Sequence, residues 1–349
     1  MKIACHLVAV FAAALLMADV TAAPAFQNPL LMQRADPQVV LHTDGYYYFT
    51  ATVPEYDRIE LRRVKDLNGL ATAQAKTVWR QHASGVMSRN IWAPEIHHID
   101  GKWYLYFTAG RADAPFDIRL YVLENASPNP LEGDWIERGQ LKTGWESFAL
   151  DATTFTVGAQ RYLAWTQRPA SSAKHLTAIY LAKMDGPLAI SGPATLLSKP
   201  EFAWEKIGFD VNEAPAALVK NGRVFLTYSA SATDANYAIG MLTADADADL
   251  LDPQAWRKSP LPVFSSSARN GQYGPGHNAF TTTPDGKQDV LVYHARNVEK
   301  ISGDPLNDPN RHTRAQLIQW RADGTPDFGT PTPDAAPSPT RHSRERGNP

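Results

Sequence analysis

Cysteine is almost absent from this chain of 349 residues, and the single cysteine, Cys5, stands close to the N-terminus. A framework of disulfide bonds or a cluster of cysteine metal ligands is therefore excluded. An excess of charge of one sign is also missing, because the formal net charge is -2. This balance provides no basic surface for nucleic acid and no acidic tail. We expect an uncharged ligand and no nucleic-acid partner.

Long apolar runs are missing except at the N-terminus. Residues 3–18 form a short apolar stretch after Lys2, and small residues follow up to Ala23. This pattern is typical of a secretory signal peptide, whereas a membrane anchor, the alternative, would need a longer run. We therefore predict a signal peptide over residues 1–23, a secreted or periplasmic protein and no membrane association.

The motifs of several enzyme classes are missing as well. The chain has no glycine-rich phosphate loop, no nucleophile elbow around a serine and no His-Glu-x-x-His motif. His97 and His98 are adjacent, and adjacent residues of a strand point to opposite faces, so they cannot bind one metal ion together. The 9 Trp, 13 Tyr and 13 Phe suit both a β-sheet core and stacking against sugar rings.

Aromatic residues gather in five strand-like segments that recur along the chain. Tight turns are indicated just before them, at positions 44, 100, 159, 221 and 285. The aromatic segments are Tyr46–Thr50, Trp103–Thr108, Tyr162–Thr166, Val224–Ser229 and Val290–His294. Third strands are predicted at Arg58–Val64, Ile118–Leu123, Ala178–Lys183, Ala238–Leu242 and Ala315–Trp320.

Five similar β units predict an all-β fold, a five-bladed β-propeller, over residues 24–329. A β-sandwich explains short strands equally well, but it does not explain five units with the same internal layout. From residue 330 onward Pro, Thr, Ser and Ala dominate, and the chain ends in a polar, basic run. We predict a disordered tail over residues 330–349, because such a segment cannot bury a core. The sequence specifies no oligomeric state.

Counting back eight residues from each turn identifies one residue in the first strand of every unit. These residues are Asp36, Trp92, Asp151, Glu213 and His277. Equivalent positions on the innermost strands of a propeller surround its axis, so we expect all five residues to line one funnel. Three carboxylates at such a position are costly unless solvent, a ligand or a chemical task accounts for them.

The three carboxylates permit hydrolysis of a glycosidic bond, which needs one carboxylic acid and one carboxylate. We assign Asp36 as the general base and Glu213 as the general acid. Asp151 would raise the pKa of Glu213 by like-charge repulsion and help to orient the substrate. Trp92 either stacks against the sugar or forms a wall of the funnel. His277 bonds a carboxylate, holds a cation with the help of waters, or is a satisfied polar plug.

The motifs around these positions resemble those of glycoside hydrolase family 43, and the resemblance spans residues 28–329. The motifs are Arg34-Ala35-Asp36-Pro37, Ile91-Trp92-Ala93-Pro94-Glu95-Ile96, Asp151-Ala152-Thr153, Asn212-Glu213-Ala214-Pro215 and Gly276-His277-Asn278. The resemblance implies a five-bladed propeller and an inverting mechanism, with the same three acidic roles. It implies no required cofactor, although some members have a central ion, often calcium, beside the residue matching His277. An arginine that contacts sugar hydroxyls is expected at Arg311, with Arg314 as the competing choice.

Within the family, residues 53–63 resemble the exo-acting α-L-arabinofuranosidases. The resemblance therefore implies an arabinose- or xylose-containing poly- or oligosaccharide as ligand, and release of terminal α-L-arabinofuranosyl residues from arabinan or arabinoxylan. A β-xylosidase, an endo-arabinanase and a non-catalytic sugar-binding propeller are the alternatives. Retention is disfavoured, because Ala35 and Ala214 stand where retaining β-fructosidases carry Asn and Cys.

Overall fold

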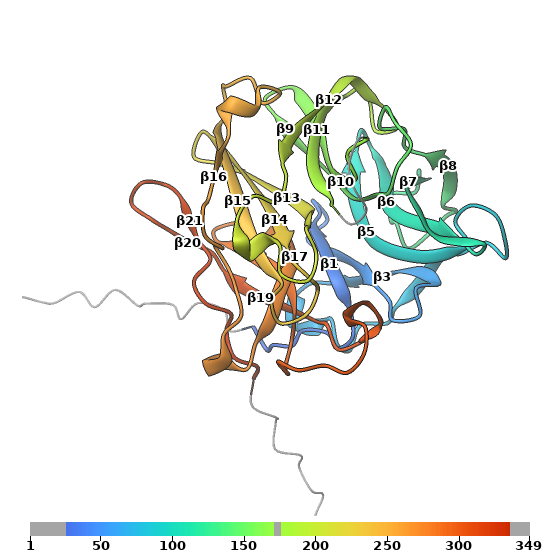
Figure 1. The fold of residues 1–349 in the computed structure, drawn as a ribbon. Helices are drawn as coiled ribbons and strands as arrows, with labels where there is room; N and C mark the ends of the chain where they lie inside the picture. The colour runs from blue at the N-terminus through green and yellow to red at the C-terminus, as the bar shows by residue number, and fades with distance from the viewer. Residues whose placement is uncertain (1–25, 171–175, 336–349) are drawn as a thin grey trace, which may run out of the picture.

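The computed structural model describes residues 26–170 and 176–335, which form blades of antiparallel β-sheet around a common axis (Figure 1). Blade 1 contains β1 (Ala35–Leu41), β2 (Tyr47–Thr52), β3 (Arg58–Val64) and β4 (Lys76–Arg80). Blade 2 contains β5 (Arg89–Ile99), β6 (Lys102–Arg111), β7 (Ala114–Asn125) and β8 (Ile136–Gln140). Blade 3 contains β9 (Ala149–Val157), β10 (Gln160–Gln167), β11 (Ala178–Met184) and β12 (Ile190–Ser198).

The remaining two blades follow in the same way. Blade 4 contains β13 (Asn212–Lys220), β14 (Arg223–Ala230), β15 (Ala238–Asp245) and β16 (Arg257–Lys258), and blade 5 contains β17 (Tyr273–Thr282), β18 (Asp289–Arg296) and β19 (His312–Leu317). A small separate sheet pairs β20 (Gln319–Trp320) with β21 (Pro326–Asp327). The short 3₁₀ helices are η1 (Leu67–Gly69), η2 (Ala203–Glu205), η3 (Pro253–Ala255), η4 (Ala268–Asn270) and η5 (Pro305–Asn307). No helix in the described part of the chain is long and apolar enough to cross a membrane.

The first strand of each blade lies on the axis. β1 contacts β5, each first strand contacts the next, and β17 returns to β1. The predicted five-bladed β-propeller is therefore confirmed, and the predicted third strands lie within or across β3, β7, β11, β15, and β19 with β20. The fourth strands escaped prediction because none of them carries the buried aromatic run of the second strands, as the exposed polar residues of β8 illustrate. The predicted signal peptide lies outside the described residues.

The core lies between the blades and explains the aromatic repeat. The second strand of each blade is buried on both faces, so it reads as a continuous apolar run instead of an alternating one. Tyr106 and Leu120 of blade 2, for example, pack against Leu163 and Trp165 of blade 3. Each such buried side chain contributes about 2 kcal/mol of hydrophobic stabilisation.

The two ends of the described chain meet at blade 5. Leu31 pairs with Thr313 of β19, and the side chain of Asn28 hydrogen-bonds the backbone of Ala315 through both its oxygen and its nitrogen. Asp334 accepts hydrogen bonds from the buried guanidinium of Arg314, and the N–H of Ala335 donates to Asn28. Residues 330–335, which belong to the segment expected to form the tail, thus contact blade 5 and the N-terminal segment. The rest of the predicted tail, residues 336–349, lies outside the described residues.

Each innermost strand contains a β-bulge near its start, where one residue adopts a positive φ. These residues are Asp36, Ala93, Asp151, Ala214 and His277, with φ between 43° and 54°. A bulge leaves a backbone N–H without a partner in the sheet. Here each N–H donates to a side chain on the second strand of the preceding blade. The acceptors, in the same order, are His294 Nδ1 (3.0 Å), Thr52 (2.7 Å), Thr108 (3.3 Å), Thr166 (3.1 Å) and Ser229 (2.8 Å).

The five residues predicted from the turns do not all occupy the same position relative to the bulge of their blade. Asp36, Asp151 and His277 are equivalent, but Trp92 and Glu213 precede the bulge residue of their blade by one position. The turn positions used for counting were themselves not equivalent. In blade 3 the position is the second residue of a two-residue loop, whereas in blades 2 and 4 it is the first.

Candidate active site

A pocket of about 510 Å³ opens at the end of the axis where the bulges lie. The bulges bend each first strand and direct its side chains toward the axis. All five residues predicted from the repeat line this pocket, and Arg311 joins them from the segment before β19. Asp36, Trp92, Asp151, Glu213 and His277 come from β1, β5, β9, β13 and β17 in turn.

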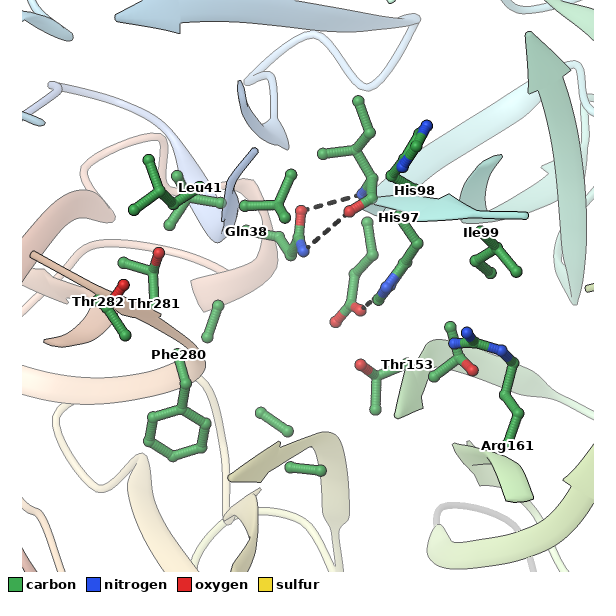
Figure 2. A pocket seen from close by; sticks show the side chains of 18 residues that line it. Gln38, Leu41, His97, His98, Ile99, Thr153, Arg161, Phe280, Thr281 and Thr282 are labelled. Carbon is green, nitrogen blue, oxygen red and sulfur yellow. Dashed lines mark hydrogen bonds and ion pairs between the residues drawn. The ribbon is translucent and has the colours of Figure 1, made fainter. Parts of the chain in front are cut away.

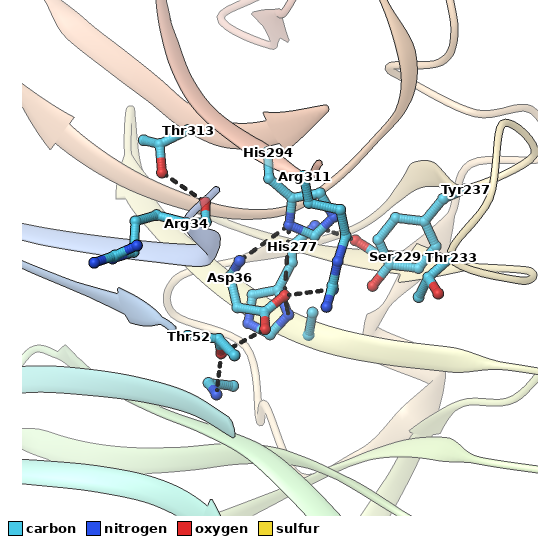
Figure 3. A network of polar contacts seen from close by, with 12 residues as sticks. Arg34, Asp36, Thr52, Ser229, Thr233, Tyr237, His277, His294, Arg311 and Thr313 are labelled. Carbon is cyan, nitrogen blue, oxygen red and sulfur yellow. Dashed lines mark hydrogen bonds and ion pairs between the residues drawn. The ribbon is translucent and has the colours of Figure 1, made fainter. Parts of the chain in front are cut away.

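Asp36 is buried at the centre of a network of polar contacts (Figure 3). Thr52 Oγ1 donates to Asp36 Oδ2 at 2.6 Å, and Arg311 donates to Oδ1 at 3.2 Å. Because Thr52 accepts the N–H of Ala93, its own hydroxyl proton is free to point at Asp36. Burial by itself would raise the pKa of Asp36, but Arg311 and the neighbouring groups hold it well below its usual range. Asp36 is therefore ionised.

Two histidines flank Asp36 and are neutral. His294 Nδ1 accepts the backbone N–H of Asp36, so the proton of this imidazole resides on Nε2. His277 Nδ1 lies 3.3 Å from Asp36 Oδ1. Burial lowers the pKa of both histidines, and Arg311 adds to the effect. The described residues include no group of three His, Cys, Asp or Glu side chains arranged to hold a metal ion.

Glu213 and Asp151 are the other two of the three predicted carboxyl groups, and they titrate as a coupled pair. Although part of Glu213 faces the open pocket, the surrounding protein desolvates it and raises its pKa to about 7. Burial and the neighbouring Glu213 raise the pKa of Asp151 as well. The N–H of Ala214 donates to Asp151 Oδ2 at 3.0 Å, which favours charge on Asp151. We infer that near neutral pH the two carboxyl groups retain one proton between them.

The two arginines proposed from the sequence lie in different places. Arg311 is buried, lines the pocket, and donates to Asp36 and to the hydroxyl of Tyr56. Arg314 lies outside the pocket, where its guanidinium bonds Asp334, Asn297 and two backbone carbonyls. Arg314 therefore holds the last described segment against blade 5.

Apolar side chains form the walls of the pocket. Trp92 is buried, with the ring of Tyr56 packed edge-on at 5.7 Å and Phe116 at 6.3 Å. Phe116 and Phe209 both line the pocket and are 64% and 46% exposed. Leu306 lines another side, and its carbonyl accepts the hydroxyl proton of Tyr56.

Sequence reasoning missed several residues that support the three carboxylates. Tyr237 donates to Glu213 Oε1 at 2.7 Å, while Thr52 and His294 hold Asp36. Thr52 and His294 stand at one repeated position, the second-strand partner of the residue before each bulge. An alignment of the five second strands could have identified that position. Tyr237 lies in a loop without a repeat, and we find no signal in the sequence that marks it.

A second cavity of about 400 Å³ lies further along the same five strands (Figure 2). Glu95 accepts from or donates to His97 Nε2 at 2.9 Å, depending on protonation, and the Gln38 amide makes two hydrogen bonds to the backbone of Ile96. His98 contacts the rings of His42 and Trp103 instead of sharing a ligand with His97. In this cavity, Glu95 is thus paired with His97, and the amide of Gln38 is satisfied by the backbone.

Comparison with known proteins identifies the family. Residues 26–326 match the family described as glycosyl hydrolases family 43. The chain belongs to glycosyl hydrolase family 43. A Streptomyces avermitilis protein named extracellular exo-α-(1→5)-L-arabinofuranosidase is 59% identical over 318 residues, covering 91% of this chain and 66% of that protein. A Humicola insolens protein named α-L-arabinofuranosidase 43 is 52% identical over 335 residues, covering 95% of this chain and 69% of that protein.

A solved structure has the same fold as this family 43 chain. The crystal structure of an α-L-arabinofuranosidase from Lactobacillus brevis superposes with a TM-score of 0.86 at 52% identity. The match covers 89% of this chain and 98% of that one. This family 43 chain spans about two thirds of the length of the Streptomyces avermitilis and Humicola insolens relatives.

Proposed function

We propose that this family 43 glycosidase is secreted and releases terminal α-L-arabinofuranosyl residues from arabinan or arabinoxylan with inversion of configuration. One observation carries the proposal: a single pocket contains an ionised carboxylate, Asp36, and a carboxyl group whose pKa is raised to about 7, Glu213. Hydrolysis of a glycosidic bond requires these two protonation states side by side. The names of the similar proteins support arabinofuranose as the sugar and an extracellular location.

The proposed reaction is one displacement by water. Asp36 takes a proton from a water molecule while the oxygen of that water attacks the anomeric carbon. The bond from that carbon to the leaving oxygen breaks. Glu213 donates its proton to the leaving oxygen, so charge and protons balance. The role proposed for Asp151 is to help keep Glu213 protonated by like-charge repulsion, because the two buried carboxyl groups titrate as a coupled pair. Arg311 keeps Asp36 ionised and orients it.

Terminal action is supported by the wall that closes one side of the pocket. This wall is the segment from 297 to 311, which joins β18 to β19 and contains η5. Tyr56 from blade 1 hydrogen-bonds the Leu306 carbonyl, and Arg296 hydrogen-bonds the carbonyl of Pro305 at 2.9 Å. A wall fixed from two blades leaves the chain of a polysaccharide free to extend in one direction only. Phe116, which is largely exposed at the pocket, is suited to carry that part of the chain.

A cation near His277 is the remaining element of the proposal. A neutral imidazole can act as a metal ligand, and burial keeps His277 neutral. Calcium prefers oxygen ligands, so waters would complete its shell. No step of the proposed reaction uses such an ion.

The proposal is tested by turnover and by product stereochemistry. Wild type, Glu213→Gln and the surface control Glu201→Gln are assayed on aryl α-L-arabinofuranoside, aryl β-xyloside and linear arabinan. We expect arabinose as the product from the arabinofuranoside and from arabinan, at wild-type rate for the control and at a rate about 10²- to 10⁴-fold lower for Glu213→Gln. Proton NMR of the first-formed sugar should show the inverted anomer. Faster xyloside cleavage, internal cleavage of arabinan or a retained anomer would each contradict the corresponding part.

A further inference from the structure

The general acid Glu213 has one hydrogen-bonding side-chain partner among the residues that the structure describes, and this partner is Tyr237. The Tyr237 hydroxyl donates to Glu213 Oε1 at 2.7 Å. Tyr237 lies in the loop between β14 and β15 of the same blade as Glu213, immediately before β15. With Oε1 occupied, Oε2 is the oxygen left to present a proton to the leaving group.

The ring of Tyr237 is held in place by blade 5 (Figure 3). It is 1% exposed and stacks on His294 with the two ring planes 2° apart and the centroids at 5.7 Å. On another side it lies against Gly276, where an added Cβ would meet its ring atoms at 2.2 Å. The orientation of the hydroxyl is therefore fixed by residues that do not belong to its own loop. His294 also holds the backbone N–H of Asp36, so the supports of acid and base are in contact.

We propose that Tyr237 is a positioning residue that fixes the carboxyl of Glu213, with Oε2 toward the leaving oxygen, and sets how readily this acid gives up its proton. The inference rests on the proposed function, in which Glu213 is the general acid. A fixed donor on Oε1 removes the second orientation that a carboxyl group has by rotation. It also makes Glu213 a stronger acid, because a hydrogen bond to a carboxylate favours the ionised form.

The charges around this pair determine the expected pH effect. Burial raises the pKa of Glu213 and the bond from Tyr237 lowers it. Asp36 also raises the pKa of Glu213 and Arg311 lowers it, while Asp151 is coupled through the shared proton. The other titratable groups that line the pocket with Glu213 are Asp36, Asp151, Arg168, His277, Asp304 and Arg311, and His294 stacks on the ring of Tyr237. Tyr237 itself stays neutral, because burial and Glu213 raise its pKa well above its usual range.

Tyr237→Phe tests the proposal, because it removes the hydroxyl and leaves the ring. The group needed is the protonated Glu213, so kcat/KM falls as pH rises through its pKa. Loss of the phenol raises that pKa, and we expect the alkaline limb to move up by about half to one pH unit. We expect kcat at the optimum to fall about tenfold for an alkyl leaving group, with little change in KM. The fall should be smaller for a nitrophenyl leaving group, which needs less help from an acid.

Tyr228→Phe is the matched control. The Tyr228 hydroxyl donates to the buried Glu205 at 2.8 Å in the same blade, outside the pocket. We expect this variant to lose stability without any shift of the alkaline limb. Gly276→Ala is a second variant that displaces the Tyr237 ring, and it should reproduce the shifted limb and the leaving-group dependence.

The outcomes separate the inference from the proposed function. An inactive wild type would overturn the proposed function. The role of Tyr237 would be overturned if wild type is active and Tyr237→Phe keeps the alkaline limb and the leaving-group dependence of wild type. It would also be overturned if Tyr228→Phe changed both properties as much as Tyr237→Phe does. Infrared difference titration of the Glu213 carboxyl gives a readout without substrate, with Glu213→Gln identifying the band. The band should titrate at higher pH in Tyr237→Phe, and an unmoved band would also count against the inference.

Discussion

The two ends of the propeller axis are built from the same five strands, yet they differ in chemistry. At the pocket end the strands bulge, and Asp36, Asp151 and Glu213 have displaced pKa values. At the other end, around the second cavity, the strands pair regularly and Glu95 is matched by His97. The carboxyl groups at the pocket end are thus held in unequal protonation states, whereas Glu95 at the other end is hydrogen-bonded to His97. The position of the bulges decides which end can perform acid–base chemistry.

The largest expected difference between the two ends comes from removing one carboxylate at each. Asp36→Asn should lower kcat about 10²- to 10⁴-fold, because it removes the carboxylate proposed to accept the proton of water. Glu95→Gln, in the second cavity, should keep kcat within about threefold. Steady-state kinetics on aryl arabinofuranoside measures both. Equal losses would mean that the two ends act as one site.

The pH profile should depend on the pocket end alone. Because the pKa of Glu213 is about 7, kcat/KM should fall as pH rises through about 7. On the acid side, the lowered pKa of Asp36 should postpone the loss of its charge to below pH 4. Glu95→Gln should leave both limbs in place. A limb that moved with Glu95 would show that charge at the far end controls the pocket.

Stability should respond to pH in the direction set by Glu213. In the unfolded chain this carboxyl ionises near its usual pKa, whereas in the fold its pKa is raised to about 7. Its contribution is therefore favourable at low pH and is lost as pH rises through about 7, so ionisation then opposes folding. Glu213→Gln should raise the free energy of unfolding by about 1–2 kcal/mol at pH 8 and less at pH 5. Urea unfolding at both pH values measures this, and a loss at pH 8 would contradict it.

Two of the hydrogen bonds from a bulge N–H to the preceding blade should respond differently to removal of the acceptor hydroxyl. Thr108→Val removes the acceptor for the Asp151 N–H and should cost about 1–2 kcal/mol of stability. Thr52→Val should cost a similar amount and also lower kcat about tenfold, because Thr52 donates to Asp36 as well. Thermal unfolding and kinetics together distinguish them. Matching kinetic effects would mean that the Thr52 hydroxyl has no special role at Asp36.

The smallest effect is expected at the far end. His97→Gln replaces the partner of Glu95 with a neutral hydrogen-bonding side chain in a cavity that is open to solvent. We expect a change in stability below about 1 kcal/mol and an unchanged kcat. Thermal unfolding in parallel with wild type measures it. A larger loss would indicate that the pair holds blade 2 in place.

The sequence was sufficient for the fold because the second strands are buried on both faces and repeat visibly. It was also sufficient to bring Asp36, Asp151 and Glu213 into one pocket. It did not separate the bulge residues from their neighbours, since a bulge changes backbone direction without changing residue type. Arg311 and Arg314 could not be distinguished either, because both are arginines near the start of one strand and only packing separates them. Tyr237 depends on a loop conformation that no periodicity encodes.

Asp36 and Arg311 are 275 positions apart, and Leu31 pairs with Thr313 of β19, so the last blade is completed by residues that precede the first. After Asp36 has been synthesised, most of the chain must still be synthesised before Arg311 leaves the ribosome. Contacts of this span delay folding, because the ends must meet before the ring can close. The nascent chain therefore has no assembled active site until residues 311–313 have been synthesised and can close the ring against residues 31–36.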